Sequence, residues 1–174
     1  HVDNVTSTIK TGSTADTIAL DTGAGFTAGA GFKLETGLGT DIFDLNTTAA
    51  VTLAAGTVTG IDTVDMMASA GLTVNNTTLS GLSAVTGVSG GDAETIFVTA
   101  ASTGETVDAS SITFTNANAV LVGGAGVDAI TGDTGADYLD GAAGNDIDTL
   151  AGGAGNDTYA VSDTGEADIY IEAA

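Results

Sequence analysis

Short apolar segments recur along the chain, each alternating with polar residues and bounded by glycine, asparagine, aspartate or serine. Strict alternation over four to six residues is typical of half-buried β-strands. Only 61–69 carries a weak helical pattern, because threonine and valine crowd most other windows and disfavour helix. The pattern therefore predicts an all-β protein. The segments expected as strands are 49–53, 72–74, 96–99, 112–115, 119–122 and 169–171.

An acidic residue followed two places later by an apolar one marks many of these segments. The spacing between these markers is irregular, which suits the coils of a parallel β-solenoid with loops of varied length better than a sandwich of hairpins. The bland interpretation is that these acids belong to degenerate repeats and face water. The markers outside the regular repeats are Asp16, Asp41, Asp62, Glu94, Glu105 and Asp168.

Residues 123–159 contain four consecutive copies of one nine-residue pattern: Gly, Gly, any residue, Gly, any residue, Asp, any residue, an apolar residue, any residue. The third copy carries two extra residues, so its apolar place falls on either Asp148 or Leu150. The glycines permit a tight turn whose carbonyls point inward. The apolar places Ile130, Leu139 and Tyr159 predict a short strand whose side chains face the core.

The sixth place of each copy is an aspartate, namely Asp128, Asp137, Asp146 and Asp157. Each adds a hard anionic oxygen beside the turn carbonyls, and calcium takes about 6 to 8 such oxygens in a flexible shell. The alternative is an acidic turn that binds nothing. Four copies in tandem, each with its acid, favour calcium.

This run resembles the RTX (repeats-in-toxin) calcium-binding nonapeptide, a solenoid signature. The resemblance implies a right-handed parallel β-roll with two repeats in each coil and calcium held between turns stacked on the same side. Asp128 would then share an ion with Asp146, and Asp137 with Asp157. The glycines implied in these turns are Gly124, Gly126, Gly135, Gly144, Gly153 and Gly155.

Four further acids are weaker metal candidates. Asp133 and Asp148 lie within the repeats, where solvated or outer roles are favoured, as they are for Asp140. Asp41 belongs to the segment TGLGTDIF, which fits the nonapeptide at places two, four, six and eight. It is the best candidate outside the regular run.

Small residues dominate the 174-residue chain, aromatic residues make up 5%, and proline is absent. A conventional globular core would be thin, whereas a solenoid stacks small and β-branched residues so that each coil covers the next. Lys10 and Lys33 face 23 acids, for a net charge of −21. Nucleic acid and anionic membranes are therefore excluded as partners, and cations are expected to offset the self-repulsion.

Several chemistries are disfavoured. Cysteine is absent, so neither a disulfide nor a thiolate site can form. His1 is the only histidine, which leaves no base for a Ser-His-Asp arrangement and no imidazole site for zinc. Paired acids such as Asp41 and Asp44 face opposite sides of a strand. No segment approaches the ~18 apolar residues of a membrane span, and we expect no enzymatic activity.

We expect an irregular Thr/Ala/Gly-rich solenoid over residues 1–120, an RTX calcium β-roll over 121–161, and a capping strand or tail over 162–174. The chain begins at His1 without a visible signal peptide, so an excerpt or a processed product is expected.

The overall character resembles S-layer proteins of type I secretion systems. It implies a secreted structural protein of the bacterial cell surface that folds and self-assembles on binding several Ca²⁺ ions, with a cell-surface polysaccharide as a candidate partner. The alternative is the non-catalytic RTX module of a larger exported enzyme, toxin or biofilm adhesin.

Overall fold

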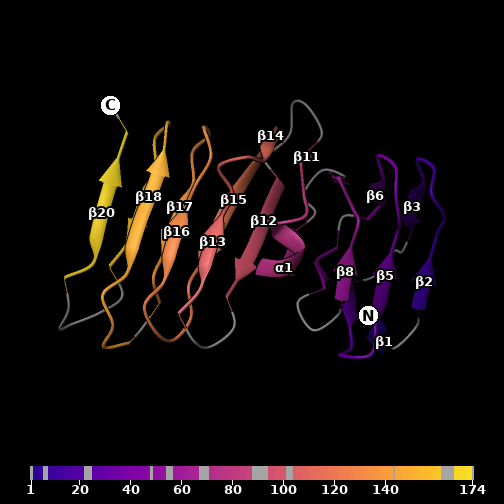
Figure 1. Ribbon diagram of the computed structural model, residues 1–174, viewed down its shortest axis with the longest axis horizontal. Helices are drawn as coiled ribbons and strands as arrows, with labels where there is room; N and C mark the ends of the chain where they lie inside the picture. The colour runs from indigo at the N-terminus through magenta and orange to yellow at the C-terminus, as the bar shows by residue number, and fades with distance from the viewer. Residues whose placement is uncertain are drawn as a thin grey trace.

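The chain winds into a parallel β-solenoid whose turns follow one another along the long axis of the molecule (Figure 1). The structure is a computed structural model, and it describes residues 2–5, 8–21, 25–47, 49–53, 57–66, 71–87, 94–100, 104–142, 144–161 and 167–173. Strands pair in parallel throughout this part of the chain, from β1 with β4 to β18 with β20. The two ends of the chain lie at opposite ends of the solenoid.

The strands form four sheets. The eight-stranded sheet has the order β1-β4-β7-β10-β12-β15-β17-β19, and the five-stranded sheet has the order β14-β11-β9-β6-β3. The four-stranded sheet has the order β13-β16-β18-β20, and the three-stranded sheet β2-β5-β8. Their bounds are β1 Val2–Val5, β2 Thr8–Lys10, β3 Thr17–Leu20, β4 Phe26–Ala28, β5 Lys33–Glu35, β6 Ile42–Leu45, β7 Val51–Thr52, β8 Thr57–Thr59, β9 Thr63–Met66, β10 Gly71–Asn75, β11 Ala84–Thr86, β12 Glu94–Thr99, β13 Thr106–Asp108, β14 Thr113–Thr115, β15 Ala117–Val122, β16 Ala129–Thr131, β17 Tyr138–Asp140, β18 Thr149–Gly153, β19 Thr158–Ala160 and β20 Ile169–Glu172.

The N-terminal coils have three sides. Each takes one strand in turn from the eight-stranded, three-stranded and five-stranded sheets, as in β4, β5 and β6. The short helix α1 (Asn76–Leu79) follows β10 and contacts β8 and β13, so it stands where the preceding coils have a strand of the three-stranded sheet. Its N-cap is Asn75, whose Oδ1 accepts a hydrogen bond of 2.9 Å from the Thr78 N–H.

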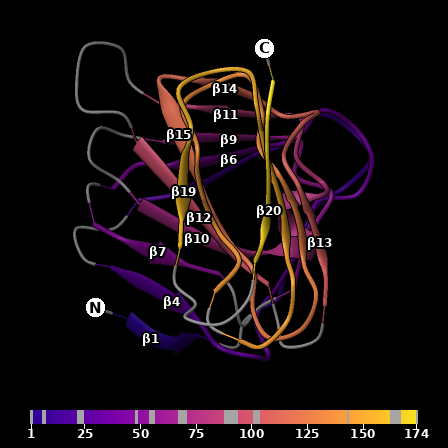
Figure 2. The same ribbon diagram turned by 90° about the vertical axis from the view of Figure 1, so that its left-hand side faces the viewer.

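The C-terminal coils have two sides. From β15 onward the strands alternate between the eight-stranded and the four-stranded sheet, and the five-stranded sheet ends at β14. Figure 2, a view from the C-terminal end, shows β19 and β20 as the opposite walls of this roll. The cross-section thus changes from three walls to two between β14 and β15.

The core consists of ladders of inward-facing side chains, one from each coil, because residues in register on successive parallel strands point the same way. Leu72, Ile96 and Ala119 form such a ladder in the eight-stranded sheet, and all three are buried. Alternate residues face out, as the burial of every second residue in β10 shows. Further ladders are Phe43–Val64–Val85 in the five-stranded sheet and Val107–Ile130–Leu150 in the four-stranded sheet.

The predicted all-β parallel solenoid is confirmed, and each of the six predicted strand segments contains an observed strand or part of one. The weak helical prediction for 61–69 is wrong where the structure describes it, since Thr63–Met66 is β9. Stacking of Val64 between Phe43 and Val85 outweighs the local pattern. None of the helices in the described ranges is long and apolar enough to cross a membrane.

Candidate metal centre

The nine-residue repeats fold as the turns that connect the two walls of the roll. Turns 123–128 and 141–148 lead from the eight-stranded to the four-stranded sheet. Turns 132–137 and 152–157 lead back, the last beginning within β18. Each turn is followed at once by a strand that carries the apolar place of the repeat, so the core ladders fix how the turns stack.

The register of the strands decides which turns are neighbours. Ile130 pairs with Leu150, which puts turn 123–128 next to turn 141–148. Leu139 pairs with Tyr159, which puts turn 132–137 next to turn 152–157. The two stacks lie on opposite edges of the roll.

Aspartates at the ends of stacked turns form carboxylate ladders, in which each carboxylate accepts a hydrogen bond from the backbone N–H of its counterpart one coil earlier. The Asp128 N–H donates to Asp148 Oδ1 at 2.7 Å, and the Asp137 N–H donates to Asp157 Oδ1 at 2.9 Å. The first ladder extends in both directions, because the Glu105 N–H donates to Asp128 and the Asp148 N–H donates to Asp168. Carboxylates therefore repeat at one-coil spacing, about 4.8 Å between parallel strands.

The structure pairs Asp128 with Asp148 rather than with Asp146, the residue predicted to share its ion. The two extra residues of the third copy lie within the turn, so Asp148, not Asp146, reaches the position of Asp128 and carries its hydrogen bond. Asp148 is 2% exposed, whereas Asp146 is only partly buried and its neighbour Ile147 is 50% exposed. Leu150 is consequently the apolar place of this copy, because its side chain has to stack on Ile130. The pairing of Asp137 with Asp157 agrees with the hydrogen bond between them.

The glycines at place one of each copy bring the turn backbone against the ladder. A Cβ added to Gly123 would lie 2.6 Å from Asp128 Oδ2 and 2.7 Å from the Gly141 carbonyl oxygen, which are impossible contacts. The same holds for Gly132, Gly141 and Gly152, each against the carboxylate of its own turn. These four glycines are not among the predicted site residues, although the first glycine of every repeat is the signal that marks them.

Places two and four shape the turns. In the last copy Gly153 and Gly155 have φ of 93° and 144°, a region that side chains rarely adopt, and both pass close to carbonyls of the turn beneath. In the first copy Gly126 has φ of 98°, and the Gly124 N–H donates to Asp128 Oδ2 at 2.9 Å.

The remaining two glycines of the predicted site, Gly135 and Gly144, have different surroundings. The Gly135 N–H donates to Asp133 Oδ1 at 2.8 Å. Gly144 is exposed in the enlarged third turn, away from the ladder position that Asp148 holds.

The charges in these turns are buried without a basic residue among them. Asp128, Asp133, Asp137 and Asp148 are each at most 7% exposed. Burial raises the pKa of Asp137 to about 6, and the negative charges of Asp133 and Asp157 add to the rise. Asp157 Oδ2 is buried with no hydrogen-bond partner. A buried carboxylate oxygen without a partner is costly, and a bound cation would remove that cost.

The donor set fits a hard cation that accepts backbone oxygens. No three His, Cys, Asp or Glu side chains converge as a metal cluster anywhere in the described ranges. An ion held in these turns would combine one or two carboxylates with carbonyl oxygens of the turns, which is the ligand mixture that calcium takes.

Comparison with known families agrees with this geometry. Residues 115–147 and 146–158 match the family model of the RTX calcium-binding nonapeptide repeat, in 4 copies. The C-terminal part of this chain is an RTX β-roll. RTX repeats bind Ca²⁺, and the β-roll is a structural calcium-binding motif. No curated protein and no solved structure matches the chain.

A third carboxylate ladder lies in the three-sided coils, outside the matched RTX repeats. The Asp16 N–H donates to Asp41 Oδ1, and the Asp41 N–H donates to Asp62 Oδ2, each at 2.8 Å. The acid-x-apolar markers at these positions thus have the same structural place as the RTX aspartates. Glu94 instead begins strand β12, and its side chain lies outside the described residues.

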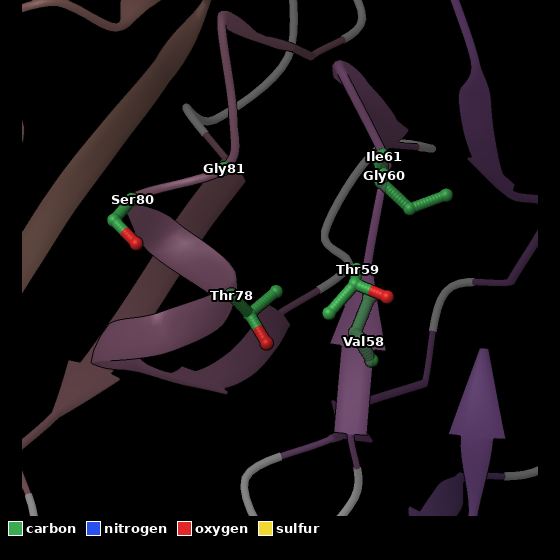
Figure 3. Close-up of a pocket in the computed structure, with 7 residues that line it drawn as sticks. All are labelled: Val58, Thr59, Gly60, Ile61, Thr78, Ser80 and Gly81. Atoms are coloured by element: carbon green, nitrogen blue, oxygen red, sulfur yellow. The ribbon is translucent and has the colours of Figure 1, made fainter. Parts of the chain in front are cut away.

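A pocket beside α1 has no charged residue in its lining. It lies between the helix and the end of β8 (Figure 3). Small apolar residues and hydroxyls form its wall, and none of these residues carries a charge. We assign it no role. Its lining residues are Val58, Thr59, Gly60, Ile61, Thr78, Ser80 and Gly81.

Proposed function

We propose that this chain is a secreted calcium-binding structural protein of the bacterial cell surface, similar to S-layer proteins, which folds and self-assembles on binding calcium outside the cell. The observation that carries the proposal is the pair of carboxylate ladders in the RTX roll. They stack buried acids coil upon coil in a chain with net charge −21 and two lysines. Such a stack is stable only where divalent cations are abundant, which is the extracellular condition.

The ligands we propose are the ladder aspartates Asp128, Asp137, Asp148 and Asp157, together with backbone oxygens of their turns. Asp146 is not in this set, because the insertion moves it off the ladder. Asp133, buried beside Asp137 and hydrogen bonded to Gly135, supports the turn.

Calcium would act as the folding switch of the roll. Extracellular calcium modules bind with dissociation constants of roughly 10⁻⁴ to 10⁻³ M. A ligand at a hundred times its dissociation constant stabilises the fold by about 2.7 kcal/mol for each site. Several sites together are comparable with the whole stability of a small domain, about 5–15 kcal/mol.

Self-assembly is supported by the surface of the last coil. Ile169, Tyr170 and Ile171 of β20 are each between 41% and 50% exposed, and β20 pairs only with β18 among the described residues. An open strand edge with apolar neighbours is a template for another strand. A second copy of the chain, or a further coil, could continue the sheet there.

The alternative remains the non-catalytic RTX module of a larger exported enzyme, toxin or biofilm adhesin, serving folding and secretion. The three-sided N-terminal coils favour the surface protein, because they extend the solenoid with a larger apolar core. A protease, lipase or pore-forming block in adjoining sequence would favour the alternative. More Thr-rich solenoid would favour the S-layer-like protein.

The first test is a calcium titration followed by far-UV circular dichroism. The parent should gain β signal, whereas a variant with Asp128, Asp137, Asp148 and Asp157 changed to Asn should not. A matched control changes four acids outside the ladders, Asp44, Asp65, Asp108 and Asp146, to Asn. A parent that is fully folded in chelator and unchanged by calcium would refute the folding role.

Electron microscopy of the calcium-loaded protein tests assembly. Calcium-dependent sheets or filaments are the expected result. A strict monomer at millimolar calcium would contradict the lattice part of the proposal and leave the folding part intact.

A further inference from the structure

We propose that the three-sided coils hold a second calcium site, outside the RTX repeats, in the stacked turns 11–16 and 36–41. Asp41 is its central ligand. This site lies outside the RTX roll, but the choice of calcium as its cation rests on the RTX repeats and so on the proposed function. The nonapeptide pattern in these turns is incomplete, so the argument rests on their structure.

The upper turn, 36–41, has the backbone of the last RTX turn, 152–157. Gly37 and Gly39 have φ of 90° and 134°, and Gly153 and Gly155 have φ of 93° and 144°. In both turns these glycines are places two and four, and the aspartate at place six follows.

Three hydrogen bonds join the two N-terminal turns and a fourth lies within the first turn, as in the two RTX turns. The Asp16 N–H donates to Asp41 Oδ1 at 2.8 Å and the Ile42 N–H to the Asp16 carbonyl at 2.9 Å. The Leu38 N–H donates to the Gly12 carbonyl at 3.4 Å and the Gly12 N–H to Asp16 Oδ2 at 3.3 Å.

Three of the four RTX counterparts are shorter, and one is 0.1 Å longer. The Asp137 N–H donates to Asp157 Oδ1 at 2.9 Å and the Thr158 N–H to the Asp137 carbonyl at 2.8 Å. The Ala154 N–H donates to the Asp133 carbonyl at 3.2 Å and the Asp133 N–H to Asp137 Oδ2 at 2.8 Å. The two pairs of turns are therefore one structure built from different sequences.

The decisive observation is the same unpartnered oxygen at the same place. Asp157 Oδ2 and Asp41 Oδ2 are both buried without a hydrogen-bond partner. Asp41 is fully buried as a residue. A carboxylate oxygen enclosed in this way requires a cation or a proton, because desolvation without compensation is expensive.

A second unpartnered oxygen lies in the same turn. Thr36 stands where the RTX turn has Gly152, is fully buried, and its Oγ1 has no hydrogen-bond partner. It points towards Gly60 of the next coil, where an added Cβ would approach it to 2.7 Å. A hydroxyl oxygen is a hard neutral ligand of the kind calcium accepts. We assign it to the same ion or to a water bound to that ion.

Lys10 does not neutralise Asp41. Lys10 pairs with Glu35 at 2.6 Å on the exposed surface just before these turns. Glu35 occupies its ammonium, so Lys10 is not a partner for the ladder of Asp16, Asp41 and Asp62, in which Asp41 is buried.

The test counts calcium ions by native mass spectrometry on the full chain. Asp41→Asn should bind one ion fewer than the parent, and Asp157→Asn should lose a different ion, so the double variant binds two fewer. Asparagine keeps an oxygen that can accept from the Asp16 N–H, so the turn can still close. Asp44→Asn is the matched control, with the same charge change three residues away on β6, and it should bind the full number.

The outcomes separate this inference from the proposed function. If Asp41→Asn binds as many ions as Asp44→Asn while Asp157→Asn loses one, the N-terminal site is refuted and the RTX roll stands. If the parent itself binds no calcium, both fail.

A second measurement covers the case in which Asp41→Asn does not fold. Hydrogen exchange of the Asp16, Leu38 and Ile42 amides in Asp157→Asn, whose substitution lies far along the solenoid, should slow when calcium is added. Equal exchange rates with calcium and with chelator would overturn the proposal.

Discussion

The three-sided coils and the two-sided roll are stabilised by different interactions. The three-sided coils enclose large side chains such as Leu34, Phe43, Leu45 and Leu72, all at most 4% exposed. The core ladders of the roll are thinner, with Leu121, Ile130, Leu139 and Leu150 as their fully buried large residues. The roll buries fewer large apolar side chains, but its turns hold buried carboxylates that can bind a cation. The comparison shows that turns at the edges of a solenoid can stabilise it in place of a large apolar core. Such a solenoid then depends on a bound cation.

The largest difference between the two regions should appear on removal of calcium. In excess chelator we expect the amides of β16 to β19 to lose their protection from hydrogen exchange, because nothing then offsets the stacked carboxylates. The amides of β9 and β10, held by burial of Val64, Met66 and Leu72, should remain protected. Equal loss in both regions would show that the whole solenoid folds as one calcium-dependent unit.

A smaller effect distinguishes the two acids of the third repeat. Asp148→Asn should remove one site from the roll, which lowers the free energy of unfolding by about 2.7 kcal/mol at calcium a hundred times the dissociation constant. Asp146→Asn, off the ladder, should change it by less than about 0.5 kcal/mol, as is usual for surface substitutions. Urea denaturation at fixed calcium measures both. A larger loss for Asp146→Asn than for Asp148→Asn would instead support the pairing of Asp128 with Asp146 expected from sequence.

Glycine substitutions compare a crowded turn with an open one. Gly155→Ala places a Cβ against the Gly135 carbonyl at φ of 144°, so we expect a loss of about 1–3 kcal/mol and weaker calcium binding. Gly81→Ala is the control, because a Cβ there makes only an ordinary contact of 3.6 Å with the Thr78 carbonyl oxygen, and Gly81 lies outside both proposed sites. Thermal unfolding and calcium titration of the two variants provide the measurement. Similar losses in both would mean that glycine acts through chain entropy alone.

The smallest effect concerns pH in chelator. The pKa of Asp137 is raised to about 6 in the folded roll from 3.8, so the folded state binds the proton more tightly than the unfolded chain. The resulting stabilisation is fully present below about pH 4 and is lost as the pH rises through 6. The metal-free roll should therefore be more stable at pH 5 than at pH 7, and Asp137→Asn should reduce this dependence. Unfolding curves at the two pH values, without calcium, test it.

Much of this organisation could be predicted from the sequence. Alternation located the strands, and the repeat located the calcium-binding roll, because each repeat carries its own turn and its own core residue. The division near Val120 stays a prediction, although the change from three walls to two between β14 and β15 lies close to it. The register of the disturbed third repeat was not predictable from spacing alone. Two alignments were possible, and only the stacking of Leu150 on Ile130 selects between them.

The sequence by itself determined the fold class and the cation, because glycine spacing, charge and alternation are local properties. The tertiary structure decided which acids are neighbours, since residues 20 or 25 positions apart meet only through the length of each coil. It also gave Asp41 the same place in a carboxylate ladder as the RTX aspartates, although the first glycine of its motif is missing. The burial of Asp41 and the unpartnered state of its Oδ2 arise only when the coils stack, so the sequence of one turn does not reveal them.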